Sequence, residues 1–286
     1  TSLYTIINPG DKILIPTPAF SIYMDDVKIL GGQPIEIDTS DDDFKLTPEK
    51  LQKVLANEGK GAKALIINYP CNPTGVVYFE ESIIRLAEIL NKKQEEYHTS
   101  IYLISDEPYR ELVYDGIEVP YLTKYYKNTI VGYSFSKSLS LPGERIGYLV
   151  IPDEVDDSGD VIGAANVANR ILGFVNAPSL TQRVVARCID EEVDVTVYNK
   201  NRELLYNSLV EYGFECIKPQ GAFYLFIKSF EEDDVAFSQK AKKHNLLIVP
   251  CTSFGCPGYC RIAYCVDYDM IKRSLPSFQK LAEEYK

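Results

Sequence analysis

The segment Ala64–Gly75 reads ALIINYPCNPTG. Its beginning, Ala64–Asn68, is almost entirely apolar, which is typical of a strand buried on both faces of a parallel sheet. Two prolines and a glycine follow, and they predict a sharp turn where the strand ends. We therefore expect a central strand that leads directly into a rigid loop, with the side-chain amide of Asn72 presented at the strand's end.

Strand-like and helix-like runs alternate on both sides of this segment. Thr47 stands where the N-cap of one expected helix would be, and the run that begins at Glu80 has apolar residues at helical spacing. The alternation predicts an α/β fold, with a mostly parallel sheet flanked by helices. The expected strands are Lys12–Pro16, Pro34–Asp38, Ala62–Tyr69, Ile101–Ser105, Thr129–Phe135 and Ile146–Ile151, and the expected helices are Phe20–Leu30, Pro48–Asn57, Glu80–Tyr97, Ser158–Gly173 and Ser179–Asp190.

The pattern changes in the last third of the chain. A long helical run, Val195–Tyr212, precedes short strand-like runs at 215–218, 222–227, 246–250 and 259–264, with helices at 235–244 and from Tyr268 onward. We expect a large domain over residues 1–190 and a smaller C-terminal α+β domain over 191–286. Because Thr1 opens what reads as a helix without a cap, we also expect part of the large domain to be missing at the N-terminus.

Composition limits the classes of partner. Lys and Arg number 30 against 41 Asp and Glu, for a formal net charge of -11, which opposes non-specific nucleic-acid binding. No apolar run reaches the length of a membrane span. The seven cysteines are scattered and odd in number, as in a protein of the reducing cytoplasm. Four of them, Cys251, Cys256, Cys260 and Cys265, lack the CxxC pairs of a zinc site and are expected to be small buried hydrophobes, so no metal is predicted.

Polar clusters follow three of the expected strands, and ligands of open α/β sheets bind at such strand ends. Besides Asn72, a carboxylate at Asp106 ends a buried strand and needs a cation, a metal or a protonated ring beside it. Lys137 leaves the next strand, and a desolvated lysine amine is a nucleophile. Arg145 lies in a tight loop, and its guanidinium matches the geometry of a phosphate.

Each cluster also has an ordinary structural interpretation. The Asn72 segment could be a simple turn, Asp106 a helix cap, Lys137 a surface lysine, and Arg145 a loop residue paired with Glu144. Jointly, however, these groups match the needs of pyridoxal phosphate, which requires a lysine for a Schiff base, a carboxylate for the pyridine nitrogen, and polar groups for the ring hydroxyl and the phosphate.

The motifs in their chain order resemble those of one enzyme family. The chain is similar to the class I/II, fold-type I, pyridoxal-phosphate-dependent aminotransferases, the aspartate aminotransferase superfamily, over essentially its whole length. The segments that carry this resemblance are NPGDKILIPTPAF at Asn8–Phe20, NPTG at Asn72–Gly75, DEPY at Asp106–Tyr109, SFSKSLSLPGERIGY at Ser134–Tyr148 and RIAY at Arg261–Tyr264.

The resemblance implies a role for each matching residue. Lys137 would bind the cofactor covalently and move the substrate proton, and Asp106 would pair with the ring nitrogen. Asn72 and Tyr109 would bind the phenolic oxygen, with Tyr109 counted among the catalytic residues and Asn72 also among those that bind substrate. The remaining expected contacts are Ser134, Ser136 and Arg145 for the phosphate, Phe20 for the ring face, and Arg261 for the substrate carboxylate.

The resemblance implies an enzyme that moves an amino group between an L-amino acid and a 2-oxo acid through a pyridoxal phosphate Schiff base. It also implies a cytoplasmic homodimer without nucleic-acid or membrane partners. Two alternatives stay open at this point. One is a β-lyase or carbon-sulfur lyase that uses the same residues. The other is a non-catalytic regulatory module with the same fold.

Overall fold

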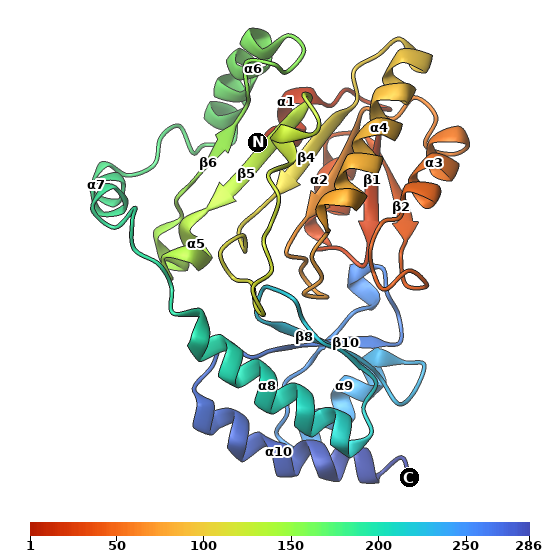
Figure 1. The fold of residues 1–286 in the computed structure, drawn as a ribbon, viewed down its shortest axis with the longest axis vertical. Coiled ribbons are helices and arrows are strands. Elements are labelled where there is room, and N and C mark those ends of the chain that lie inside the picture. Colours follow the sequence, from red (N-terminus) through yellow and green to blue (C-terminus); the bar gives the residue numbers. More distant parts are fainter.

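The computed structural model describes residues 1–286, and its larger sheet has six strands in the order β2-β1-β3-β4-β5-β6. Five strands are parallel and the edge strand β6 is antiparallel to β5, as Figure 1 shows. The strands are β1 (Lys12–Thr17), β2 (Gln33–Asp38), β3 (Ala64–Asn68), β4 (Tyr102–Asp106), β5 (Thr129–Ser134) and β6 (Gly147–Val150).

Helices cover both faces of this sheet, and alternate residues of its strands contribute to two separate cores. Leu65 and Leu103 pack in one core with side chains of α3 (Pro48–Ala56) and α4 (Glu80–Tyr97). Ile66 and Ile104 face the other core, which includes side chains of α1 (Ser2–Ile6), α2 (Ile22–Ile29) and α6 (Ser158–Ile171). The central strands are therefore buried on both sides, as their continuous apolar sequence predicts.

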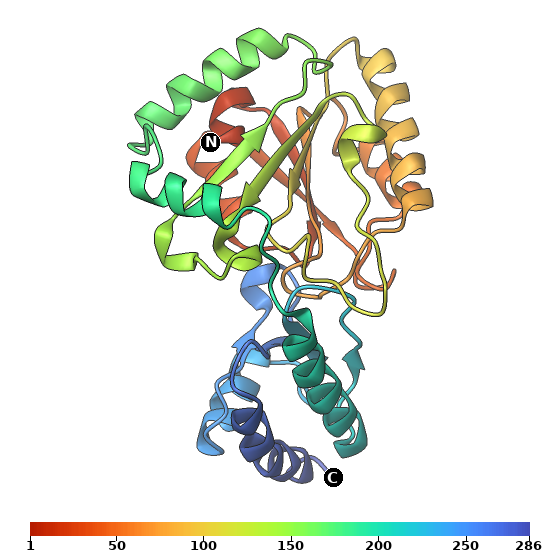
Figure 2. The same cartoon turned by 60° about the vertical axis from the view of Figure 1, so that its left-hand side comes forward.

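A second, four-stranded antiparallel sheet follows in the order β7-β8-β10-β9. Its strands are β7 (Cys216–Ile217), β8 (Tyr224–Lys228), β9 (Val249–Pro250) and β10 (Tyr259–Ala263), and its helices are α8 (Val195–Tyr212), α9 (Asp234–Lys243) and α10 (Tyr268–Glu283). Leu205, Phe237 and Leu281 bring the three helices into one core with β8 and β10. Figure 2 shows this unit below the large sheet, with α6 and α7 (Ser179–Arg187) beside β6 above it.

Backbone hydrogen bonds join the loop between β7 and β8 to the turns that follow β3 and β4. The amides of Gln220 and Gly221 both donate to the carbonyl of Gly75, at 2.8 and 2.9 Å. Tyr114 N donates to Gln220 O at 3.1 Å. A Cβ atom at Gly221 would lie 2.6 Å from the Cβ of Pro70, so only glycine allows this approach. The two units therefore meet at the edge of the large sheet where its parallel strands end.

The predicted α/β fold with a smaller α+β unit is confirmed, with local differences. Lys137 follows the expected strand as predicted, but it lies in a one-turn helix, α5 (Phe135–Ser138). This helix begins after Ser134, whose hydroxyl accepts a hydrogen bond from the backbone N–H of Ser136. The strand expected at 246–250 is only β9. The short 3-10 helices are η1 (Leu122–Lys124), η2 (Pro142–Glu144) and η3 (Thr252–Phe254). None of the helices has the length and apolar character that crossing a bilayer requires.

Candidate active site

Three neighbouring parallel strands end in polar residues at the same edge of the large sheet. β3 ends at Asn68, β4 at Asp106 and β5 at Ser134. The strand register pairs Asn68 with Asp106, and Asp106 with Gly132, which precedes Ser134 by two residues. An amide, a carboxylate and a hydroxyl therefore follow one another across the sheet edge, as expected for the ligand site of an open α/β sheet.

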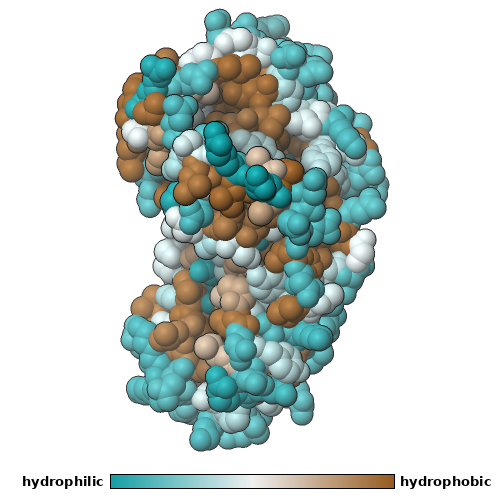
Figure 3. Space-filling model, turned by 90° about the vertical axis from the view of Figure 1, so that its left-hand side faces the viewer, coloured by the Kyte–Doolittle hydropathy of each residue, from teal (hydrophilic) through white to brown (hydrophobic).

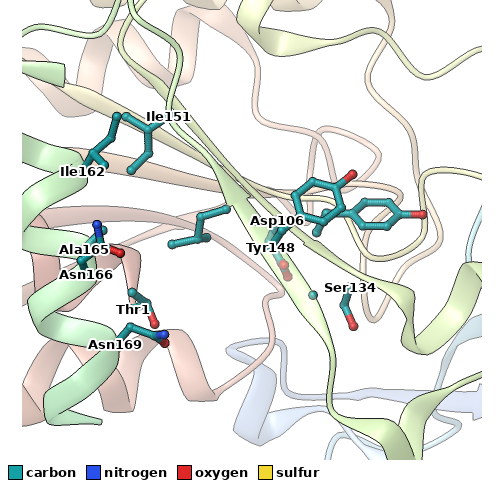
Figure 4. Close-up of a pocket in the computed structure, with 13 residues that line it drawn as sticks. Thr1, Asp106, Ser134, Tyr148, Ile151, Ile162, Ala165, Asn166 and Asn169 are labelled. Carbon is teal, nitrogen blue, oxygen red and sulfur yellow. The ribbon is translucent and has the colours of Figure 1, made fainter. Parts of the chain in front are cut away.

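A cavity of about 650 Å³ opens beside these strand ends. Asp106, Gly132 and Ser134 lie on its sheet side, and Figure 4 shows the α6 side chains Asn166 and Asn169 across from Asp106 and Ser134. The volume is in the range of pockets that hold small organic ligands, roughly 300–1,000 Å³. A smaller hollow of about 330 Å³ shares Asp106 and Gly132 with this cavity and is also lined by Tyr23.

The carboxylate of Asp106 is held on one side only. Its Oδ2 accepts hydrogen bonds from the Tyr23 hydroxyl and from Asn68 Nδ2, the latter at 3.2 Å. Its Oδ1 accepts none from the chain and lies on the Gly132 side. Burial raises the pKa of Asp106 to about 6, although the hydrogen bond from Tyr23 acts in the opposite direction. One carboxylate oxygen is thus fixed and the other is available to a ligand.

Lys137 lies among aromatic rings that come from both parts of the chain. Its Nζ is 5.9 Å from the ring centroid of Tyr109 and 5.2 Å from that of Phe223, which belongs to the small unit. The Tyr109 hydroxyl is 3.0 Å from the hydroxyl of Tyr224, another small-unit residue. Burial raises the pKa of Tyr109 above its usual value, so its phenol keeps its proton near neutral pH.

Arg261, on β10, reaches the turn after β3. Its Nη1 donates to Asn72 Oδ1 at 2.7 Å, although the two residues are 189 positions apart. The guanidinium lies over the ring of Tyr224, with the carbon Cζ 4.3 Å from the centroid. Its Nε is buried without a hydrogen-bond partner. Contacts therefore run continuously from Lys137 through Tyr109, Tyr224 and Arg261 to Asn72. The backbone N–H of Asn72 in turn donates to Asn68 Oδ1 at 2.8 Å, beside Asp106.

Other predicted site residues stand apart from this set. Arg145 is exposed, has a left-handed backbone with φ of 52°, and donates from Nη1 to the carbonyl of Pro142 at 2.9 Å. Phe20 is 39% exposed and meets Tyr23 edge-on with 6.0 Å between ring centroids. The hydroxyls of Ser134 and Ser136 bind each other at 2.7 Å, and of the two only Ser134 lines the cavity.

Three residues at the site were not predicted from the sequence: Tyr23, Asn68 and Tyr224. Asn68 could have been found, because it is the last residue of a predicted buried strand. Tyr23 carried no distinguishing signal, since an aromatic residue on a helix usually packs against the core. Tyr224 comes from the other sheet, and no local pattern predicts its approach to Tyr109.

The side chains that could bind a metal ion are not gathered at one place. The chain holds no group of three or more His, Cys, Asp or Glu side chains placed to bind a metal ion. All seven cysteines are free, and of the four expected to be buried, Cys265 is instead exposed. Burial raises the pKa of Cys251 and Cys260 above the usual value for a thiol, to about 12 for Cys260. Their sulfur atoms therefore stay in the neutral thiol form near pH 7.

Comparison with known proteins places these features in a family. A family model described as aminotransferase class I and II matches residues 2–277. A Bacillus subtilis protein named a probable N-acetyl-LL-diaminopimelate aminotransferase is 30% identical over 95% of this chain and 67% of its own length. Aromatic-amino-acid aminotransferase 2 of Thermococcus litoralis is 29% identical over 99% of this chain and 73% of its own. The crystal structure of an aminotransferase from Eubacterium rectale matches with a TM-score of 0.93 and 44% identity, covering 99% of this chain and 71% of that one.

Proposed function

The chain belongs to the class I and II aminotransferases, and we propose that the residues around the end of β4 form its transamination site. Members of this family use pyridoxal phosphate to move an amino group between an amino acid and a 2-oxo acid. The observation that carries the proposal is the continuous set of contacts that joins Lys137, Asn72 and Arg261 beside the one-sided carboxylate of Asp106.

The donor and acceptor groups on the sheet edge fit pyridoxal phosphate. Asp106 Oδ1 accepts no hydrogen bond from the chain and suits a protonated ring nitrogen. The Ser134 hydroxyl lines the same cavity and suits a phosphate oxygen. The buried Nε of Arg261 has no partner, and an unpaired buried donor costs about 1–3 kcal/mol. A carboxylate that accepted from this group would remove that cost.

Each residue then has a defined task. Pyridoxal phosphate, when bound, supplies an electron sink for the negative charge that develops at the amino-acid Cα. With the cofactor bound, the Lys137 amine would hold it and would take and return the Cα proton of the substrate. Asp106 would keep a positive charge on the ring nitrogen, because its carboxylate stabilises the protonated form. The remaining proposed contacts are Asn72 and Tyr109 to the ring oxygen, Ser134, Ser136 and Arg145 to the phosphate, and Phe20 to the ring face.

The substrate is held by its α-carboxylate. Arg261 has N–H groups free beyond its bond to Asn72 and lies on the aromatic face of Tyr224, and a guanidinium binds a carboxylate with two parallel hydrogen bonds. The amino acid and the 2-oxo acid of the second half-reaction share this carboxylate, so one arginine serves both. Relatives act on different donors, N-acetyl-LL-diaminopimelate and aromatic amino acids according to their names, so a panel of amino acids identifies the donor of this chain.

The decisive experiment measures the attachment of the cofactor and the conversion of amino acids in two separate steps. The protein is mixed with pyridoxal phosphate, reduced with borohydride and mapped by mass spectrometry, with the adduct expected on Lys137. A panel of L-amino acids is then tested with 2-oxoglutarate and pyruvate as acceptors. We expect ping-pong kinetics and a 2-oxo acid product without released ammonia, whereas a lyase would release ammonia.

The Lys137→Ala variant should abolish both the adduct and the turnover, and Lys92→Ala, an exposed lysine of α4, should change neither. Full turnover by Lys137→Ala would refute the proposal. A protein that attaches the cofactor but converts no amino acid in the panel would favour the regulatory module instead.

We propose that two copies of the chain associate. Several large apolar side chains of α6, α7 and the loop between them are exposed, including Val167, Ile171, Phe174 and Leu180. Figure 3 shows apolar surface gathered on the upper part of the side where these helices lie. Exposed apolar patches of this kind mark association surfaces. Light scattering should give twice the mass of one chain, and Leu180→Asp should lower it.

We also propose a division into a cofactor-binding domain, residues 1–190, and a small domain, residues 191–286, and a cytoplasmic location. The two separate sheets support the division, whose boundary lies between α7 and α8. Seven unpaired cysteines support the reducing compartment. Limited proteolysis between residues 188 and 194 would test the boundary, and cell fractionation the location.

A further inference from the structure

The two oxygens of the Asp106 carboxylate have different surroundings. Oδ2 accepts the hydrogen bonds from the Tyr23 hydroxyl and from Asn68 Nδ2. Oδ1 lies on the other side, 3.9 Å from the position that a Cβ atom at Gly132 would take, and it accepts no bond from the chain. The protein therefore anchors one oxygen and turns the other toward the shared wall of the two cavities.

Tyr23 and Asn68 can each act only as a hydrogen-bond donor toward Asp106. Burial and the charge of Asp106 raise the pKa of Tyr23 well above its usual value, so its phenol stays protonated and donates. The orientation of the Asn68 side-chain amide is fixed by two backbone contacts. Its Oδ1 accepts from the backbone N–H of Asn72 at 2.8 Å, and its Nδ2 also donates to the backbone carbonyl of Asp106 at 2.9 Å. Both donors are thus committed to the anionic form of Asp106.

These two hydrogen bonds matter because few other groups stabilise the ionised form of Asp106. Burial raises the pKa of Asp106 to about 6, the neighbouring Glu107 raises it further, and the hydrogen bond from Tyr23 lowers it. Glu107 is itself buried, and its carboxylate is already bound by the Ser105 hydroxyl and the Arg110 guanidinium. Loss of the hydrogen bond from Tyr23 would therefore raise the pKa of Asp106 further.

We propose that Tyr23 and Asn68 are positioning residues, which keep Asp106 ionised and aim its Oδ1 at a protonated ring nitrogen in the cavity. The identity of that ring rests on the proposed function, but the anchoring of the carboxylate does not. Tyr23 is supplied by α2 and Asn68 by β3, so helix packing and strand register together set the direction of the carboxylate.

The first test uses the cofactor-free protein. Aspartate labelled with ¹³C at the carboxyl carbon is titrated by NMR between pH 4 and 9, and the Asp106 signal is identified by its loss in Asp106→Asn. We expect a midpoint near 6 in the wild type. In Tyr23→Phe it should rise by about one to two units, or ten- to hundredfold in proton affinity, as the loss of a hydrogen bond to a charged group predicts. Asn68→Ala should shift it in the same direction, and serves if Tyr23→Phe does not fold.

Tyr125→Phe is the matched control, because the Tyr125 hydroxyl also donates to a carboxylate, that of Glu80, away from the cavity. It should leave the Asp106 midpoint unchanged. An Asp106 midpoint that stays within about 0.3 units of the wild type in Tyr23→Phe or in Asn68→Ala, against the shift expected from the lost bond, would overturn the proposal.

The second test adds the cofactor. Tyr23→Phe should weaken the binding of pyridoxal phosphate about tenfold at pH 6.5 and less at pH 8.5, where the carboxyl is ionised again. The analogue with carbon in place of the ring nitrogen should bind both proteins equally. If the wild type bound this analogue more tightly than Tyr23→Phe did, the effect of Tyr23 would not depend on the ring nitrogen. That result would contradict the proposal that Oδ1 is directed at this nitrogen. If the wild type forms no adduct on Lys137, the proposed function fails, whereas the NMR midpoint still decides the anchoring of Asp106.

Discussion

Two arginines of the small unit have similar surroundings but differ in how many of their N–H donors are hydrogen-bonded. Arg202, on α8, and Arg261, on β10, both cover a tyrosine ring, at 4.4 and 4.3 Å from the guanidinium carbon to the centroids of Tyr114 and Tyr224. Both also bind the large unit. The partners of Arg202 are Asn199 at Nε, the Pro219 carbonyl at Nη1, and Asp115 and Glu203 at Nη2, whereas Arg261 binds Asn72 and leaves a buried Nε without a partner.

The difference teaches how to separate a structural arginine from a ligand-binding one. Burial alone does not do so, because Arg202 is the more buried of the two, at 1% exposure. The state of the donors does. A guanidinium carries five N–H donors, and Arg202 has committed all three of its nitrogens to the chain. Arg261 retains donors beside an aromatic wall, and its unmade hydrogen bond is a cost that a carboxylate ligand would remove.

The largest expected effect is on catalysis at Arg261. In Arg261→Gln, kcat/KM for the amino-acid donor should fall about thousandfold, near 4 kcal/mol, because the loss of one partner of a buried charge pair costs about 2–5 kcal/mol. The free energy of unfolding should change by less than about 1 kcal/mol. Steady-state kinetics and urea unfolding measure the two quantities. Arg273→Gln, an exposed arginine of α10, is the control, and an equal loss of kcat/KM in both variants would break the comparison.

The next effect is on stability at Arg202. Arg202→Met should lower the free energy of unfolding by about 3 kcal/mol, because it leaves the Pro219 carbonyl without its donor and removes the cation from the Tyr114 ring. Urea unfolding of Arg202→Met and Arg261→Met, with Lys200→Met as a control from the exposed side of α8, measures the difference. We expect Arg261→Met to lose far less, and equal losses would show that donor state does not separate the two sites.

The sequence predicted the fold because the fold depends on repeated local patterns. Ala64–Asn68 and Ile101–Ser105 are apolar enough to require burial on both faces, and the intervening amphipathic helix of Glu80–Tyr97 supplies the cover. Once the strands are parallel, their ends must share one edge. That rule alone predicts that Asn72, Asp106 and Ser134 lie in the same region.

The sequence could not predict contacts that depend on the packing of distant elements. Tyr224 meets Tyr109 across 115 positions, and Arg261 meets Asn72 across 189, so neither pair follows from local spacing. Arg202 reads as an ordinary polar residue of an exposed helix until the Pro219 segment covers it. Arg145 shows the limit for loops, since its side chain follows the backbone of its own turn and donates to Pro142, a direction that residue type does not fix.

A smaller effect tests the tyrosines under the two arginines. Tyr224→Phe keeps the ring beneath Arg261 but removes the bond to the Tyr109 hydroxyl, so kcat/KM should fall about fivefold, equivalent to the roughly 1 kcal/mol of one hydrogen bond. Tyr114→Phe removes the bond to the Ala222 carbonyl and should instead lower stability by a similar amount. In a Tyr109→Phe background, Tyr224→Phe should have little further effect. A full, additive loss in the double variant would show that the two hydroxyls act independently.

The smallest expected effect concerns pH, and it follows from the charge partners of Arg202. The hydrogen bond from Arg202 lowers the pKa of Asp115 below its usual value, so the folded state binds the proton more weakly than the unfolded one. The resulting stability is present above the unfolded pKa of about 3.9 and is lost as pH falls through the folded pKa. Because Asp115 is 54% exposed at its side chain, the contribution at pH 7 should be only about 0.5 kcal/mol. Urea unfolding of the wild type and Asp115→Asn should differ by this amount at pH 7 and by nothing near pH 2. Arg261 has no carboxylate partner in the chain, so Arg261→Met should change the free energy of unfolding equally at pH 7 and near pH 2. If the change disappeared in acid, Arg261 would have an anionic partner in the folded chain. It would then be a structural arginine, like Arg202.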